Sequence, residues 1–464
     1  MNRITPRVAH VSSFRQGGAA TAAQRLHRSL GDLGVRSHFL CGQPAVDTDD
    51  SSQSPDQPRR SSESIDSPFA AVRSGDDRNA LQRFQDYVRF RLHRRTFKRA
   101  VRGGPNQTDL FSSPIAATTC GWSGGVPDAI DIVQLHWIAK GLHQPRFFET
   151  LQQVPVVWTL HDMNAFTGGC HYSGGCERFQ NGCGHCPQLS VPSETDITRQ
   201  LTSIKDASLR ELDLHVVAPS RWLLDSARSS HVFRHARSFH HIPYAMELDD
   251  WNADRGAHLR HQECVGEEEM IILFGAMDLD SPRKGGRELF AALHEITKRP
   301  SKRPFGLWTF GAGNPVSELP NGVSHRHFGL VQDADRLRQI YSASDLFVLP
   351  SLEDNLPLTG IEAMAAGTPV VGFRAGGIPD YVVEGETGWL ADVGSSESLA
   401  ARIQRMIDHP EQTAAMGLNA RRKAEAEFAC PLEATRYCEL YDDILADRVN
   451  RSRDRRGRSS SIAA

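Results

Sequence analysis

The chain has 464 residues, of which 39% are hydrophobic and 23% charged, and its formal net charge is -3. This length allows two or three domains, and the composition is typical of a soluble globular protein. The small net charge argues against nucleic acid as a partner, and no apolar run reaches the roughly 18 residues of a membrane span. Because the start MNRITPRVAHVSS lacks the apolar core of a signal peptide, we expect a cytoplasmic protein.

Strand-like and helix-like segments alternate through the first half of the chain. This alternation is typical of a parallel sheet with helices on both faces. From their residue types and periodicity, we expect strands over 7–12, 37–42, 131–137, 154–162 and 215–220, and helices over 17–34 and 220–230.

The segment IPYAMELDDW (242–251) interrupts this alternation, which restarts at residue 270. We therefore predict an α/β fold with two doubly wound, Rossmann-like domains, residues 1–245 and 246–431. The last helix, 432–449, has no strand after it and is expected to complete the first domain. In the second domain we expect strands over 270–277, 305–313, 346–351 and 369–373, and helices over 285–298, 336–345, 360–367 and from about 395.

Two segments have the composition of disordered chain. An insert at about 46–80 is rich in Ser, Asp and Pro, and the tail 450–464 is rich in Arg and Ser. Such segments bury too little apolar surface to fold, so we predict disorder for both.

The stretch LPSLEDNLPLTGIEAMAAGTPVVGF (349–373) places acids where a parallel sheet binds ligands. Glu353 and Asp354 follow a strand, and ligands bind outside the carboxyl ends of such strands. We expect Pro357, the backbone N–H groups of residues 359–361 and Glu362 in the first turn of the next helix, where phosphate is favoured. Glu362 would accept ribose hydroxyls and Asp354 would face a sugar hydroxyl. A simple capping role explains Glu362 alone equally well.

Two cations precede the helix expected at 285–298. Arg283 and Lys284, followed by Gly285 and Gly286, suit a clamp on a diphosphate at a helix N-terminus. The alternative is a solvated basic turn. Near the start of the chain, glycines 17 and 18 precede a long helix and would let the backbone approach a ligand, although a plain helix-start turn explains them as well.

Two histidines follow buried strands. His161, next to Asp162, and His136 are both expected at strand ends facing a cleft. A lone histidine is more often a hydrogen-bonded structural residue, so this signal is weak by itself.

Four cysteines lie in one loop, 168–189, with the spacing C-x5-C-x6-C-x2-C. The final C-x2-C pair is typical of zinc knuckles, and four thiolates would complete a tetrahedral structural zinc site. Free buried thiols and reversible disulfides are the alternatives. A catalytic metal is not expected, because four protein ligands leave no open position. The predicted ligands are Cys170, Cys176, Cys183 and Cys186.

The stretch 81–102 carries eight Lys or Arg after Leu81 against one Asp. Its apolar residues recur at helical spacing, so it could dock on anionic lipid as a peripheral membrane contact at the inner face of the membrane. A solvated charged helix is the alternative.

Residues 349–373 resemble the E-x7-E region of retaining glycosyltransferases with the GT-B fold, in glycosyltransferase family 4. Asp354 stands in place of the first Glu and Glu362 matches the second. Residues 376–390 also resemble this family, and the cysteine loop with its preceding HDM resembles a subgroup close to colanic-acid-type exopolysaccharide transferases. The resemblance implies two domains facing across a cleft. It also implies transfer from a nucleotide diphosphate sugar to a saccharide or lipid-linked acceptor, with retention and without a divalent metal.

The resemblance assigns roles to single residues as well. It implies that His161 and Asp354 orient the sugar, that Glu362 holds the ribose, and that Arg283 and Lys284 stabilise the leaving diphosphate. Glu353 could replace Asp354 as the first acid. Further donor contacts are expected from Gly17, Gly18, Gly275, Glu353, Asn355, Leu356, Pro357 and Thr359.

Two other functions compete with this interpretation. Because the first acid is shortened and Met277 or Asp278 stands where the family usually has an Arg, the chain could be a catalytically silent scaffold that binds a partner through its cysteine loop. A nucleotide-dependent oxidoreductase or epimerase is disfavoured, because the first strand leads into SSFRQGGAA and not into G-x-G-x-x-G.

Overall fold

The computed structural model describes residues 5–15, 17–41, 80–102, 110–115, 129–251, 255–298, 303–313 and 319–462. The insert predicted to be disordered at about 46–80 lies outside these ranges except for its last residue.

The N-terminal domain is built on one parallel sheet. Its strands lie in the order β2-β1-β3-β4-β5-β6, with Val8 paired to Ile132 across β1 and β3. The strands are β1 (Arg7–Ser12), β2 (Arg36–Cys41), β3 (Ile132–Leu135), β4 (Val156–Thr159), β5 (Leu214–Ala218) and β6 (Ser238–His241). The helices are α1 (Gly18–Asp32), α2 (Ala80–Val101), α3 (Gln144–Glu149), α4 (Ile197–Leu209) and α5 (Arg221–Ser229).

The C-terminal domain repeats this architecture. Its parallel sheet has the order β12-β11-β10-β7-β8-β9, in which β7 and β10 are neighbours although two strands separate them in the chain. The strands are β7 (Met270–Asp278), β8 (Phe305–Ala312), β9 (Ser324–His327), β10 (Leu346–Leu349), β11 (Val370–Phe373) and β12 (Gly388–Ala391). The helices are α6 (Gly256–Gln262), α7 (Gly286–Thr297), α8 (Ala334–Ser342), α9 (Leu358–Ala365), α10 (Ser396–Asp408) and α11 (Pro410–Glu427).

Both sheets are covered on both faces, as their nearly continuous apolar strands require. In β1, Val8 packs in the cluster that includes α1, whereas the next residue, Ala9, packs in the cluster that includes α3 and α5. In β7, Ile271 and Ile272 divide in the same way between two clusters. The prediction of two Rossmann-like α/β domains is therefore confirmed.

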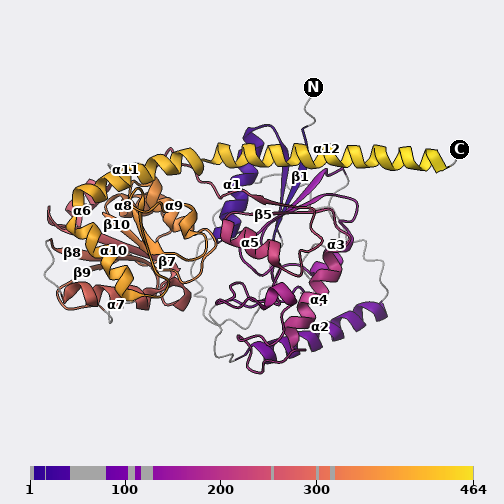
Figure 1. Cartoon of the computed structure of the whole chain (residues 1–464), viewed down its shortest axis with the longest axis horizontal. Coiled ribbons are helices and arrows are strands. Elements are labelled where there is room, and N and C mark those ends of the chain that lie inside the picture. Colours follow the sequence, from indigo (N-terminus) through magenta and orange to yellow (C-terminus); the bar gives the residue numbers. More distant parts are fainter. Residues whose placement is uncertain are drawn as a thin grey trace.

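The last helix, α12 (Cys430–Ile462), leaves the C-terminal domain and runs along the N-terminal one (Figure 1). Its Tyr437 and Tyr441 are fully buried among residues of β1, β3 and α1. The Tyr437 hydroxyl lies 2.6 Å from Thr159 Oγ1, and the Tyr441 hydroxyl donates to Gln134 Oε1 at 3.0 Å. These bonds satisfy polar side chains inside the sheet, so α12 is an integral layer of the N-terminal domain.

One prediction about the end of the chain was wrong. The tail expected to be disordered from residue 450 continues α12 as far as Ile462. This part of the tail has no proline and a single glycine, and arginine favours helix, so a helix already nucleated by packing can propagate through it. Along the described ranges, every helix is too short or too polar to cross a lipid bilayer.

Candidate active site

The candidate site lies where the strand order of the C-terminal sheet reverses. The chain proceeds outward from β7 on one side and from β10 on the other, so the loops after these two strands flank a crevice. The loop after β7 forms a 3₁₀ turn, Pro282–Lys284, before α7, and the loop after β10 leads into α9. Gly285 has φ +72°, and a Cβ there would lie 1.8 Å from the Pro350 carbonyl oxygen, so only glycine allows this approach.

The two loops bring opposite charges together. Lys284 Nζ lies 2.6 Å from Asp354 Oδ2, and Arg283 Nη1 lies 3.3 Å from the same oxygen. Burial alone would raise the pKa of the Asp354 carboxyl, but the charges of Lys284 and Arg283 outweigh it and hold the pKa below its ordinary value. Asp354 is therefore ionised at neutral pH and balances one of two neighbouring cations.

The two candidate first acids have different partners. Glu353 accepts hydrogen bonds from the backbone N–H and hydroxyl of Ser173, both at 3.2 Å, and from the Gly174 N–H at 2.7 Å. Glu353 thus holds the tip of the cysteine loop, whereas Asp354 faces the cations. Arg283 joins both regions, because its guanidinium lies 4.0 Å from the ring centre of Tyr172 in the cysteine loop.

Glu362 lies in the same domain but not where the sequence placed it. Helix α9 begins at Leu358 with Pro357 as its N-cap, so Glu362 is the fifth helical residue and lies beyond the first turn. The N–H of Gly360 is also already used, because it donates to the Pro357 carbonyl at 3.1 Å. The ring of Pro357 fixes its φ at a helical value, but its ψ of 116° is extended. The helix therefore begins at the next residue, Leu358, and not at Pro357 itself.

The surroundings of Glu362 suit a hydroxyl-binding carboxylate. Its Oε2 accepts a hydrogen bond from the Tyr341 hydroxyl at 3.1 Å. Burial raises the pKa of the Glu362 carboxyl, and the charge of Arg25 on α1 of the other domain opposes that rise. Near the N-terminus of α9, the Tyr381 hydroxyl is buried and has no hydrogen-bond partner among the described residues. A Cβ at Gly360 would lie 2.2 Å from it, so this unpaired group lies against the start of the helix.

His161 belongs to a buried chain of hydrogen bonds. Its Nδ1 lies 2.6 Å from the Tyr244 hydroxyl and its Nε2 lies 3.3 Å from Nδ1 of His136, whose Nε2 lies 3.0 Å from Nδ1 of His10. Burial lowers the pKa of His161 to about 4, so the imidazole is neutral. Both of its ring nitrogens are engaged by protein in this arrangement, and a sugar contact would require one of these bonds to exchange.

Asn355 connects this chain to the other domain. Its Nδ2 donates to the His161 carbonyl at 3.1 Å, and its Oδ1 accepts from the Ser220 hydroxyl at 2.7 Å. Asp380 of the C-terminal domain likewise accepts from the Arg221 N–H at 2.7 Å. The histidine side of the site and the charged loops are thus held together across the interface between the domains.

The remaining predicted donor residues divide into two groups. Gly17 has φ +94°, and a Cβ at Gly17 or Gly18 would meet nothing within 4 Å, so open space faces this turn. Gly275 lies inside β7, where a Cβ would come within 2.0 Å of the Phe310 ring, so packing accounts for its missing side chain. Leu356 is buried in the core, and Pro357 is the N-cap of α9. Thr359 is half-buried in the first turn of that helix.

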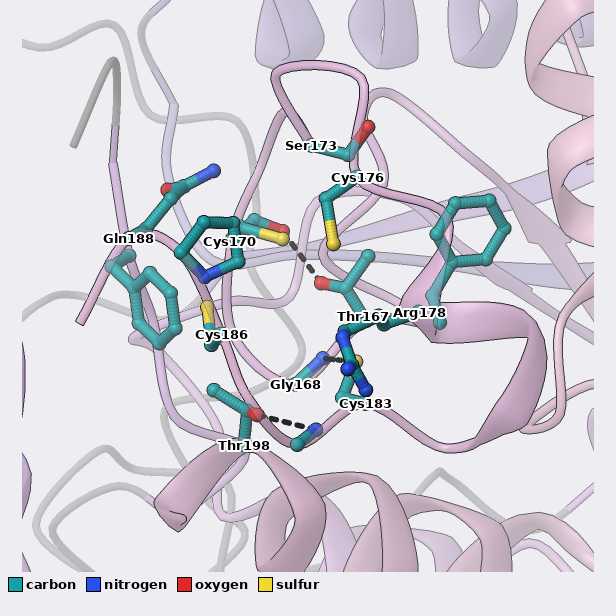
Figure 2. A pocket seen from close by; sticks show the side chains of 14 residues that line it. Thr167, Gly168, Cys170, Ser173, Cys176, Arg178, Cys183, Cys186, Gln188 and Thr198 are labelled. Carbon is teal, nitrogen blue, oxygen red and sulfur yellow. Dashed lines mark hydrogen bonds between the residues drawn. The ribbon is translucent and has the colours of Figure 1, made fainter. Parts of the chain in front are cut away.

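The cysteine loop places its four cysteines around one small pocket (Figure 2). All four are free thiols. Burial raises the pKa of Cys183 to about 12 and that of Cys186 to about 11. In the part of the chain that the structure describes, no three His, Cys, Asp or Glu side chains are already placed to hold a metal ion. The tetrahedral site expected from the spacing is therefore not preformed.

Helix α2 rests on this loop. Phe97, Ala100 and Val101 pack with Phe111 and with residues of α4 in a cluster that also contains Cys186. The helix lies at the edge of the N-terminal domain, beside α4 and away from the C-terminal domain (Figure 1). Its outer side exposes Leu92 by 62% together with the cations Arg89, Arg91, Arg94, Arg95, Lys98 and Arg99, and Arg102 is exposed directly after the helix.

Comparison with known proteins finds a family match in the C-terminal domain. Residues 268–409 match the family described as glycosyl transferases group 1, which spans β7, β10 and the charged loops. D-inositol 3-phosphate glycosyltransferase of Corynebacterium glutamicum is 36% identical over 176 residues, 36% of this chain and 42% of that protein. The putative colanic acid biosynthesis glycosyl transferase WcaC of Escherichia coli is 29% identical over 227 residues, 47% and 51% of the two chains. The chain thus spans about half or less of the length of these two relatives.

Solved structures resemble the chain over nearly its whole length. Sucrose-phosphate synthase of Thermosynechococcus elongatus superposes with a TM-score of 0.60 at 20% identity, covering 95% of this chain and 100% of that one. Anabaena HepE, solved with UDP and glucose, gives a TM-score of 0.54 at 16% identity over 94% and 99% of the chains. Residues 268–409 therefore form a domain that matches the group 1 glycosyltransferases, and the chain as a whole has the two-domain GT-B fold of these solved structures.

Proposed function

We propose that this protein transfers a sugar from a nucleotide diphosphate sugar to a saccharide or lipid-linked saccharide acceptor, with retention of the anomeric configuration. One observation carries the proposal: Lys284 and Arg283 meet Asp354 at the reversal point of the family domain's sheet. This is where an open parallel sheet binds its ligand, and two adjacent cations match the charge of a diphosphate.

The proposed chemistry follows from these charges. The bond between the anomeric carbon and the diphosphate oxygen breaks, and the acceptor oxygen forms the new bond to that carbon. The proton of the acceptor hydroxyl is released to solvent, and the diphosphate leaves with one more negative charge. Lys284 and Arg283 would stabilise that charge in place of a divalent metal, because they are already fixed at the site. We assign no carboxylate nucleophile.

The remaining side chains suit the sugar and ribose parts of the donor. Glu362, already in contact with the Tyr341 hydroxyl, would accept the ribose hydroxyls, and the unpaired Tyr381 hydroxyl is available near the start of α9. Asp354 and His161 would orient the transferred sugar, for which His161 must exchange its bond to Tyr244 or to His136. HepE binds UDP and glucose, so a uridine nucleotide is the first donor to test.

For the acceptor, we propose a growing cell-surface or extracellular polysaccharide at the cytoplasmic face of the membrane. The similarity to a transferase named for colanic acid biosynthesis supports a polysaccharide. The exposed cations and Leu92 of α2 support a peripheral contact with anionic lipid, which would bring the enzyme to a lipid-linked acceptor. The catalytically silent scaffold is not favoured, because the named relatives are transferases.

The test is release of nucleoside diphosphate from UDP-, GDP- and ADP-sugars, with and without bacterial lipid extract, in the presence of a chelator. The expected result is slow release from one donor class that accelerates when the extract supplies an acceptor. Proton NMR of the product would report the anomeric configuration. A folded protein that releases nothing from any of these donors, with or without extract, would contradict the proposal.

A further inference from the structure

The cysteine loop contains a pocket that the proposed transfer reaction does not use. Residues of this loop, together with Phe111 and Thr198, surround a cavity of about 20 Å³. This is room for an ion or a single water molecule and is far too small for a sugar or a nucleotide. The thiols of Cys170, Cys176, Cys183 and Cys186 all line it (Figure 2).

A hydrogen-bond donor points at one of the sulfur atoms. The Gly168 N–H donates to Cys183 Sγ at 3.2 Å (Figure 2). The Leu189 N–H donates instead to the carbonyl oxygen of Cys186, at 3.2 Å. A neutral thiol in an apolar pocket gains little from a donor to its sulfur, whereas a thiolate bound to a metal is stabilised by it.

A buried cation lies beside the thiols. Lys205 on α4 is 1% exposed, and its Nζ donates to the carbonyl oxygens of Asn164 and Thr167. Its charge interacts with Cys170 and Cys183. Four thiolates around a divalent cation carry a net charge of about two negative units, and a fixed positive charge nearby offsets part of it. Lys205 also interacts with the carboxylate of Asp162, so metal-bound thiolates would add a second source of negative charge beside this buried cation.

The C-x2-C turn, residues 183–186, has a backbone conformation that suits a loop around a metal ion. Cys183 and His185 have φ of +59° and +45°, a left-handed backbone conformation that residues with a side chain adopt only at a cost in free energy. This turn carries the sulfurs of Cys183 and Cys186 to the same pocket. Bonds from a metal ion to the sulfurs of Cys183 and Cys186 would hold the turn closed and offset the cost of these positive φ angles.

We propose that Cys170, Cys176, Cys183 and Cys186 bind one zinc-like divalent cation as thiolates, and that this ion is structural. Binding displaces the four thiol protons to solvent, and no oxidation or reduction takes place. Because no three candidate ligands are yet placed to hold a metal, the side chains must turn inward about their Cα–Cβ bonds as the ion binds. The ion would stiffen the loop whose tip, Ser173 and Gly174, is held by Glu353 of the other domain.

The test measures the metal content of the full-length protein. Protein purified under reducing conditions without chelator is analysed by mass spectrometry for metals, and zinc release by a mercurial reagent is followed with a chromogenic chelator. One zinc per chain is expected, with complete loss in the double variant Cys183→Ser/Cys186→Ser. Cys264→Ser is the matched control, because that cysteine is exposed and lies in the C-terminal domain. It should retain the metal.

Chelator-treated wild-type protein provides a second test that does not depend on folding of a variant. It should take up one zinc ion per chain and unfold at a higher temperature afterwards. Three results would overturn the proposal: no uptake of zinc, equal zinc in the double variant and the wild type, or disulfides among these four cysteines in peptide mapping. Nucleotide binding is measured separately, so a metal-free protein that binds nucleotide would reject this inference and leave the proposed function intact.

Discussion

Lys284 Nζ lies 2.6 Å from Asp354 Oδ2, although the two residues come from loops that follow different strands, 70 residues apart. Asp354 is 6% exposed and also lies 3.3 Å from Arg283 Nη1, so one buried carboxylate is shared by two cations. The cluster carries one net positive charge. A bound diphosphate would supply the missing negative charge and compete with Asp354 for the same cations.

Removing one of these cations should weaken catalysis more than it weakens folding. In Lys284→Ala, the departing diphosphate loses one of two positive charges. We expect the rate constant for transfer to fall by about 10²–10³-fold, as for other fixed groups that stabilise developing charge. The measurement is steady-state release of nucleoside diphosphate from the donor identified in the screen.

The matched control for this variant is Arg287→Ala. Arg287 lies on α7 just beyond the same loop but is exposed to solvent. It should leave the rate within about twofold of wild type, since exposed charges contribute little. Equal effects of the two substitutions would show that Lys284 has no special role.

Glu353 should act on the cysteine loop and not on the diphosphate. Glu353→Ala removes the acceptor of three hydrogen bonds from Ser173 and Gly174. Loss of bonds to a charged acceptor costs about 1.5–3 kcal/mol, so amide exchange at residues 173–174 should accelerate by at least tenfold. Hydrogen–deuterium exchange followed by mass spectrometry measures this directly.

Glu386→Ala is a suitable comparison for that experiment, because Glu386 is an exposed acid of the same domain. It should leave exchange at 173–174 unchanged. If exchange there is the same in Glu353→Ala as in wild type, then Glu353 does not hold the loop.

Stability should decrease as pH rises, because of Glu433. Burial raises the pKa of this α12 carboxyl from 4.5 to about 8. Below pH 4.5 the group is protonated in both states, but between that pH and about 8 only the unfolded chain loses the proton. The free energy of unfolding should therefore fall by up to about 1.4 kcal/mol per pH unit across this range. Above pH 8 the contribution is fully lost.

Urea unfolding at a series of pH values tests this slope. Glu433→Gln should remove this contribution to it, whereas Glu439→Gln, at an exposed position of the same helix, should retain it. The same slope in wild type and Glu433→Gln would mean that the Glu433 carboxyl is ionised in the folded protein.

The interior of the fold and the edge strand β2 could be predicted from sequence, but the edge strands β6 and β9 could not. Central strands such as Val156–Thr159 are buried on both faces and read as apolar runs. The edge strands Ser238–His241 and Ser324–His327 are half exposed and rich in histidine, so they carry no such signal. Their position becomes clear only from their pairing with β5 and β8.

The residues of the site also divide into those that the sequence predicted and those that it did not. Arg283, Lys284, Asp354 and Glu362 were recognisable because each lies in a short segment whose pattern suggests a ligand loop. Tyr172 and Tyr341 donate hydrogen bonds to Asp354 and Glu362, and the Tyr381 hydroxyl lies against Gly360 at the start of α9, but none of the three lies in a segment whose pattern suggests a loop that binds the donor. In sequence they look like core aromatic residues, and only tertiary packing brings their hydroxyls to the acids.

Helix α2 should bind anionic lipid surfaces. The double variant Arg95→Glu/Lys98→Glu replaces two positive charges by two negative ones and so lowers the net charge of the helix's exposed side by four units. At low ionic strength each basic residue contributes about 1 kcal/mol near an anionic bilayer, so vesicle binding should drop by well over tenfold. Co-flotation with vesicles of phosphatidylglycerol and phosphatidylcholine is the assay.

The control is Arg287→Glu/Lys298→Glu, an equal change of charge at exposed positions of α7 and its C-terminal end in the other domain. This variant should float with anionic vesicles as the wild type does. Wild-type protein that floats equally with pure phosphatidylcholine vesicles, or with neither kind, would rule out an electrostatic contact through α2.

The central claim is that the loops after β7 and β10 bind a nucleoside diphosphate, and calorimetric titration tests it most directly. Wild-type protein and Lys284→Ala are titrated with UDP, GDP and ADP in buffer that contains a chelator. We predict that one nucleotide binds the wild type with one site per chain, and that Lys284→Ala weakens this binding at least tenfold, about 1.4 kcal/mol. No binding of any of the three by folded wild-type protein, or the same Kd in both proteins, would contradict the account.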